Sequence, residues 1–122
     1  MTGVDERPPI WIGHALLTVS DLPKSADFWV AIGMREIELN DEVAIMELRG
    51  GTHLLLLPGT PTPADAPFDL MVEDVAAARA RWSEQGFTVS DLEHMHSHDS
   101  FWLSDPDGTR VLVNSTHVIG VV

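Results

Sequence analysis

Short runs of apolar and polar positions along the chain are separated by turn residues, and a stretch with helical spacing lies between the first two runs. The first run, residues 14–19, leads to Asp21, an acidic residue suited to cap a helix predicted over residues 22–32. Gly33 is placed to end that helix, because glycine adopts the left-handed conformation at low cost. Alternation and the turns between the next runs then predict three strands, at residues 37–39, 43–48 and 52–57.

The same pattern recurs in the second half of the chain. Five residues of the first half recur at an offset of 53 (position 21 to position 74), namely Leu17, Val19, Asp21, Trp29 and Gly33 as Leu70, Val72, Asp74, Trp82 and Gly86. Gly51 and Thr52 recur as Gly108 and Thr109. The second copy therefore predicts a strand at residues 68–72, a helix over residues 75–85, and three strands at residues 88–92, 100–104 and 109–115.

These elements predict an α+β fold of two βαβββ modules in a single domain spanning residues 10–122. The first module covers about residues 10–58, and the second covers about residues 68–117. Residues 59–67 are rich in proline and read as the linker, and residues 1–9 read as a flexible tail. Trp29 and Trp82 occupy equivalent places in the two helices, where we expect them to pack each helix against its sheet.

Composition narrows the classes of function. The chain has no cysteine, which excludes disulfides, thiolate metal sites and a cysteine nucleophile. Its net charge of -12 disfavours nucleic acid and anionic membranes as partners, and a cationic or neutral ligand is easier to attract. No apolar stretch is long enough to span a membrane, and residues 1–9 lack the features of a signal peptide, so we expect a cytoplasmic protein.

The order of elements, the repeated acidic helix starts and the turn Asp105-Pro106-Asp107-Gly108 resemble the vicinal-oxygen-chelate superfamily of glyoxalases, bleomycin-resistance proteins and extradiol dioxygenases. The resemblance covers about residues 10–117. It implies curled, mixed four-stranded sheets around a small-molecule cavity, and a homodimer.

In the enzymes of this family, metal ligands stand on the first and last strands of each module. At these positions the chain has His14, whose repeat partner is Pro67, and the last-strand residues Leu55 and Leu112. Leucine and proline side chains offer a metal no donor, so we expect ligand sequestration without a cofactor. The alternative is a lyase, isomerase or dioxygenase with an unusual set of ligands for Zn, Ni, Mn or Fe, drawn from His14, His53, Asp69 and Glu47.

Strand alternation places His53 and Leu57 on the face of Leu55, and Arg110 and Asn114 on the face of Leu112. Phe101 and Trp102 must point in opposite directions, which leaves open which of them faces the ligand. We expect an apolar or cationic aromatic ligand to be bound by the following residues: His14, His53, Leu55, Leu57, Trp102, Arg110, Leu112 and Asn114.

A run of alternating histidines, His94, His96 and His98, falls in residues 93–99, where we expect a turn between strands. Two interpretations stay open. The run is a solvated loop without a role, or it is a rim that uses His94 or His96 for acid-base chemistry or for binding a transition metal.

Overall fold

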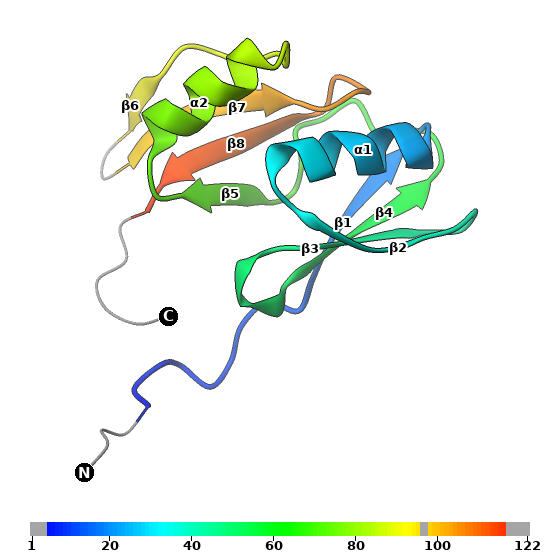
Figure 1. Cartoon of the computed structure of the whole chain (residues 1–122). Coiled ribbons are helices and arrows are strands. Elements are labelled where there is room, and N and C mark those ends of the chain that lie inside the picture. Colours follow the sequence, from blue (N-terminus) through cyan, green and yellow to red (C-terminus); the bar gives the residue numbers. More distant parts are fainter. Residues whose placement is uncertain (1–4, 96–97, 117–122) are drawn as a thin grey trace.

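The computed structural model describes residues 5–95 and 98–116 (Figure 1). The first module consists of β1 (His14–Val19), α1 (Leu22–Ile32), β2 (Arg35–Leu39), β3 (Ala44–Glu47), the single 3-10 turn η1 (Arg49–Gly51) and β4 (His53–Pro58). The second module consists of β5 (Asp69–Val72), α2 (Val75–Glu84), β6 (Glu93–Met95), β7 (His98–Ser104) and β8 (Arg110–Ser115). The predicted α+β order of two βαβββ modules is therefore confirmed.

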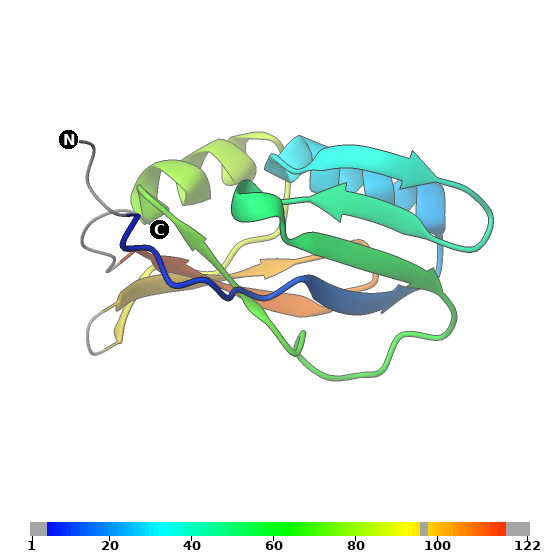
Figure 2. The same cartoon turned by 90° about the horizontal axis from the view of Figure 1, so that it is seen from below.

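Each module has one mixed sheet, with strand order β1-β4-β3-β2 in the first and β5-β8-β7-β6 in the second. The first and last strands of each module pair in parallel, and the other neighbours pair antiparallel. Neither sheet is closed into a barrel. In Figure 1 each helix lies over its own sheet, and Figure 2 shows the strands from below.

Both helices begin where the sequence predicts. The Asp21 carboxylate accepts a hydrogen bond from the Lys24 amide at 3.1 Å, and the Asp74 carboxylate accepts one from the Ala77 amide at 2.9 Å. Each bond satisfies a backbone donor that the first helical turn leaves free. Gly33 ends α1 with a φ of 132°, a conformation that favours glycine. Helix α2 ends at Glu84, one residue before the predicted end.

The core lies between each helix and its sheet. Trp29 is fully buried and Trp82 is 2% exposed, which confirms their predicted packing role. The Trp82 ring lies 5.7 Å from the Phe101 ring, measured between centroids. Beneath the helices lie the alternate residues of the two central parallel strands, namely Leu54, Leu56, Val111 and Val113. Because these point toward the helices, their neighbours in the strands point to the opposite faces.

The strand predicted at residues 88–92 is wrong. Val89 forms only a single bridge with Leu103, and strand β6 begins four residues later than Val89, at Glu93. The Ser90 hydroxyl accepts a hydrogen bond from the Trp102 amide at 2.7 Å, in the place of a backbone carbonyl. A side chain that bonds the backbone in this way competes with the regular ladder, which is why alternation alone misplaced the strand.

The two modules touch on the helix side and at the last turn. The Phe28 and Phe87 rings meet edge to face with centroids 5.0 Å apart. The Asp107 carboxylate accepts hydrogen bonds from the Ser20 amide, at 3.0 Å, and from the Ser20 hydroxyl. The linker is also bound to the second sheet, because the Ala66 amide donates to the Arg110 carbonyl at 2.8 Å. These contacts place the two sheets side by side.

Asp105 anchors the final turn from a buried position. One of its carboxylate oxygens accepts hydrogen bonds from the Asp107 and Thr109 amides, both at 2.9 Å. The other oxygen is buried and has no hydrogen-bond partner among the described residues. Burial raises the pKa of the Asp105 carboxyl above its ordinary value, although the backbone hydrogen bonds from Thr109 and Asp107 act in the opposite direction.

As the pH rises, ionisation of Asp105 should lower the free energy of unfolding of the wild-type protein. We expect this decrease to be absent from Asp105→Asn. The folded state holds the Asp105 proton more tightly than the unfolded state, so this group stabilises the fold at low pH. That contribution is lost as the pH rises from the ordinary Asp pKa of about 4 through the raised folded value. Asparagine keeps the oxygen that accepts from Thr109 and carries no charge. Urea unfolding of both proteins between about pH 4 and 7 measures the difference, and the exposed substitution Asp41→Asn is the control. If the free energy of unfolding of Asp105→Asn depends on pH as it does in the wild-type protein, the raised pKa is not that of Asp105.

Candidate functional site

The sheet face that points away from α1 carries four residues of the predicted ligand set. The register of the parallel pair aligns His14 with His53, Leu16 with Leu55, and Thr18 with Leu57. Leu16 is 51% exposed, whereas Leu55 and Leu57 are half-buried. We call the sheet faces that point away from the two helices the open faces. The predicted alternation of His53, Leu55 and Leu57 on one face is consistent with this arrangement.

Two histidines and a glutamate lie together on the first open face. The His14 and His53 rings are 6.1 Å apart between centroids. His53 Nε2 lies 2.9 Å from Glu47 Oε2, since the register of β3 and β4 places these residues opposite each other. The other Glu47 oxygen lies 3.5 Å from Arg35 Nε. Glu47 therefore orients the His53 ring and places a carboxylate on this face.

On the second open face, Leu112 lies between Asp69 of β5 and Trp102 of β7, its partners in the two neighbouring strands. Phe101 is buried against α2 at 1% exposure, so Trp102 belongs to the opposite, open face. The structure thus decides which of the two aromatic residues is available to a ligand. The indole of Trp102 and the leucine beside it form an apolar surface on this face.

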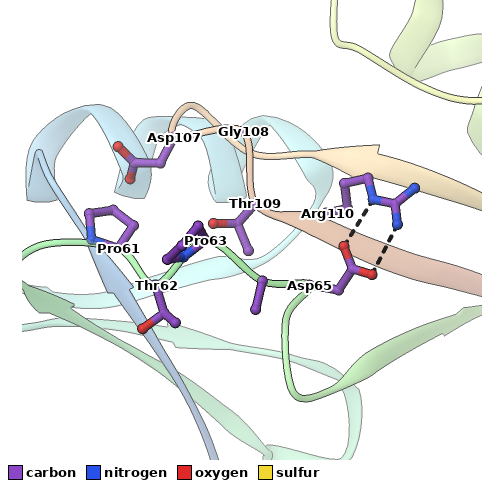
Figure 3. A pocket seen from close by; sticks show the side chains of 9 residues that line it. Pro61, Thr62, Pro63, Asp65, Asp107, Gly108, Thr109 and Arg110 are labelled. Carbon is purple, nitrogen blue, oxygen red and sulfur yellow. Dashed lines mark hydrogen bonds and ion pairs between the residues drawn. The ribbon is translucent and has the colours of Figure 1, made fainter.

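Arg110 lies over the Trp102 ring, with its guanidinium carbon 4.2 Å from the ring centroid. Its Nε and one terminal nitrogen donate to the two carboxylate oxygens of Asp65, at 2.9 and 3.0 Å (Figure 3). The Asp65 carboxylate raises the pKa of Arg110 first through this hydrogen bonding. A pocket of about 530 Å³ lies between the linker and the last turn, and both residues line it. The ion pair with Asp65 offsets the charge of Arg110. The sequence pattern did not predict this pair.

Asn114 is buried, and both polar atoms of its side chain are hydrogen-bonded. Its side-chain oxygen accepts from the Ser100 hydroxyl at 2.6 Å, and its side-chain nitrogen donates to Asp69 at 2.9 Å. Asn114 therefore holds the carboxylate of Asp69, which is the exposed member of the pair. Sequence reasoning predicted Asp69 only as a metal ligand, although alternation places it on the same face as Met71 and next to Leu112.

The metal-ligand alternative has no assembled set in the described residues. Within residues 5–95 and 98–116, no three histidine, aspartate or glutamate side chains are arranged to hold a metal ion. His14, His53 and Glu47 share the first sheet, whereas Asp69 lies in the second sheet and binds Asn114. Asp69 therefore does not join the two histidines, whereas the set of His14, His53 and Glu47 stays a prediction, and we derive no chemical step through a metal.

The histidine run does not form the expected turn over all of residues 93–99. Residues 93–95 belong to β6 and residues 98–99 begin β7, because the two strands pair in a hairpin that aligns His94 with Asp99. The His94 ring nitrogen Nδ1 contacts the Asp99 carboxylate. His98 Nδ1 lies 2.8 Å from the Ser115 carbonyl oxygen. His96 lies outside the described residues, so the proposed rim role of that residue stays a prediction.

Comparison with known families places the chain in one class. The family described as the Glyoxalase/Bleomycin resistance protein/Dioxygenase superfamily matches residues 11–113, and the chain belongs to it. A comparison with curated proteins found no match. Neither helix in the described parts of the chain is long and apolar enough to cross a membrane.

Solved structures share the fold at low sequence identity. A member of this superfamily from Sphaerobacter thermophilus has a TM-score of 0.76 and 23% identity, covering 88% of this chain and 98% of that one. TnmS3, an antibiotic-binding protein from a Streptomyces species, has a TM-score of 0.76 and 24% identity, covering 89% and 98%. A lactoylglutathione lyase from Agrobacterium tumefaciens has a TM-score of 0.75 and 18% identity, covering 94% and 100%. One fold thus serves both binding proteins and enzymes, and function must be argued from the site.

Proposed function

We propose that the protein binds and sequesters a small apolar or cationic aromatic molecule on its open faces, without a metal. One observation carries the proposal, namely that the second open face has a solvent-accessible apolar centre, Trp102 and Leu112, bordered by polar groups held in place by hydrogen bonds. Small-molecule sites typically combine an apolar wall with a few oriented polar groups. The antibiotic-binding function of the Streptomyces protein of the same fold agrees with this class of function.

The charges on the open faces favour a cationic group on the ligand. Glu47 and Asp69 place a carboxylate on the first and second face, each bound to a neighbouring side chain. The positive charge of Arg110 on its own would repel a cationic ligand. Its ion pair with Asp65 offsets this charge, so Arg110 opposes the preference for a cation only weakly. The net charge of -12 adds long-range attraction for a cation.

We also propose that two copies of the chain pair as a homodimer and cover the open faces. Leu16 and Met71 are 51% and 47% exposed in the single chain. Just before β1, Ile10, Trp11 and Ile12 are 79%, 68% and 70% exposed. Contiguous exposed apolar residues of this kind mark interaction surfaces, and a self-complementary pairing buries the same patch on both copies. Sedimentation equilibrium at micromolar concentration tests the dimer, and a strict monomer there contradicts it.

Titration of the intrinsic tryptophan fluorescence tests ligand binding. We expect a cationic aromatic dye such as proflavine to bind and to change the emission of Trp102. Trp29 and Trp82 are buried away from the open faces, and a Trp11→Phe background removes the signal of the other exposed tryptophan. A neutral compound, N-phenyl-1-naphthylamine, is the comparison. Raising the salt concentration to about 0.5 M should lower the affinity for the cationic dye and leave the affinity for the neutral one unchanged, because salt screens charges. If neither compound binds at low salt, the assignment of this site fails.

Metal content separates sequestration from the enzymatic alternative. We expect protein purified without an affinity tag to contain no stoichiometric transition metal, because Leu55 and Leu112 offer no donors and no described trio of His, Asp or Glu is assembled. Elemental analysis measures this directly. We likewise expect no isomerisation of the methylglyoxal-glutathione hemithioacetal. Activity that chelation removes and nickel or zinc restores would favour the metal-dependent alternative.

A further inference from the structure

A second cavity lies between the two modules, away from the centres of the open faces. It has a volume of about 750 Å³ and runs along β5, the edge strand of the second sheet. The end of α1 and η1 line it from the first module, and α2 lines it from the second. Cavities that hold small ligands typically measure about 300–1,000 Å³, so this one has a suitable size.

The wall of this inter-module cleft is largely apolar. Ile32 and Met34 contribute from the first module, and Leu70 and Trp82 contribute from the second. All four side chains are at most 8% exposed and form a fixed floor, and the half-buried Leu48 and Val72 supply apolar surface that a ligand can reach. A ligand with an apolar body can therefore be desolvated against this wall.

The charged residues of the cleft leave one cation without an acidic partner. Asp74 caps α2 and Glu73 pairs with Arg49 at 3.2 Å, whereas Asp69 lies on the second open face, where it accepts from Asn114. By contrast, Arg81 forms no hydrogen bond or ion pair with any carboxylate in the described parts of the chain. Its guanidinium carbon lies 5.9 Å from the centroid of the Trp82 ring, at the border between the apolar wall and the solvent.

We propose that the inter-module cleft binds an amphipathic organic anion. A carboxylate or sulfonate group is held by the exposed guanidinium of Arg81, which offers several donors in a planar arrangement. The apolar body of the ligand lies against Leu48 and Val72, above the buried floor of the cleft. This preference for an anion is opposite to that proposed for the open faces, so the two sites take different ligands and the failure of one leaves the other intact.

Two dyes that differ in one group test the charge requirement. 8-Anilinonaphthalene-1-sulfonate carries a sulfonate, and N-phenyl-1-naphthylamine is nearly the same molecule without it. We expect the sulfonate dye to bind with a stoichiometry of one per chain at physiological ionic strength. Arg81→Gln should lower the affinity for the sulfonate dye by about tenfold, since a charge-assisted hydrogen bond contributes roughly that factor to binding. The same substitution should leave the affinity of the uncharged dye unchanged.

Three further variants show whether the sulfonate dye occupies the cleft. Glu73→Gln frees Arg49 at the mouth of the cleft and should strengthen binding of the sulfonate dye by about two- to fivefold. This gain would not arise from misfolding. Lys24→Gln removes the same charge as Arg81→Gln from a residue outside the cleft, and Trp102→Ala alters the open face. Neither should change the affinity for the sulfonate dye.

The inference is overturned by any of four outcomes. The sulfonate dye does not bind at all, or Arg81→Gln leaves its affinity unchanged. Alternatively, Lys24→Gln weakens it as much as Arg81→Gln, which would indicate only long-range charge. Finally, if Trp102→Ala abolishes binding, the dye occupies the open face instead of the cleft.

Discussion

Replacing Trp29 with alanine is expected to lower the free energy of unfolding by about 3–5 kcal/mol, because a large, fully buried side chain leaves a cavity in the core. Trp29 has no exposed surface, and its ring lies 4.9 Å from that of Phe28, measured between centroids. Phe28 in turn contacts Phe87 of the second module. The substitution therefore weakens both the packing of α1 on its sheet and the contact between the modules.

Trp29→Phe is expected to be much milder, with a loss of about 1–2 kcal/mol. It keeps an aromatic ring and removes the indole nitrogen, which is buried without a hydrogen-bond partner among the described residues. Urea unfolding followed by circular dichroism measures both variants. Val30→Ala, at a position on the same helix that is 46% exposed and away from the open faces, is the control and should change stability by no more than about 0.5 kcal/mol. A loss below about 1 kcal/mol for Trp29→Ala would contradict the central place of this residue.

Leu112→Arg is expected to weaken binding of the cationic aromatic dye by about 30-fold or more, because a central apolar contact is worth about 2 kcal/mol or more. Leu112 lies between Asp69 and Trp102. A guanidinium at this position would occupy the apolar centre and would pair with the Asp69 carboxylate, which we propose to face the cationic group of the ligand. Fluorescence titration measures the affinity. Sedimentation of the same variant shows whether the dimer also depends on this face.

Val30→Arg provides the matched control for Leu112→Arg. Val30 is 46% exposed on α1, on the side of the first sheet opposite the open face, so the same charge there should leave dye binding unchanged. Circular dichroism establishes that both variants are folded. If a folded Leu112→Arg protein binds the dye with wild-type affinity, the ligand does not use the second open face.

Local patterns along the chain determined the order of elements. The repeat of Asp21 and Asp74, each followed by a helix, predicted both helix starts, because a capping carboxylate acts on amides only three residues away. Alternation likewise separated the buried Leu54 and Leu56 from the open-face residues beside them. The same reasoning failed at residues 88–92, where the Ser90 hydroxyl replaces a backbone partner of β7. Alternation cannot detect such a bond, since it joins residues that are distant in sequence.

The sequence by itself determined the α+β fold with its two modules, the packing of Trp29 and Trp82, and the residue types available on each open face. Only the tertiary structure decided which of these side chains are free for a ligand. Asp65 binds Arg110 and Asp69 binds Asn114, and each pair is separated by 45 positions in the chain. The inter-module cleft likewise exists only in the folded chain, because the end of α1, η1, β5 and α2 line it together. Short-range periodicity reports which face a residue occupies, whereas the partner that it meets depends on how the two sheets come together.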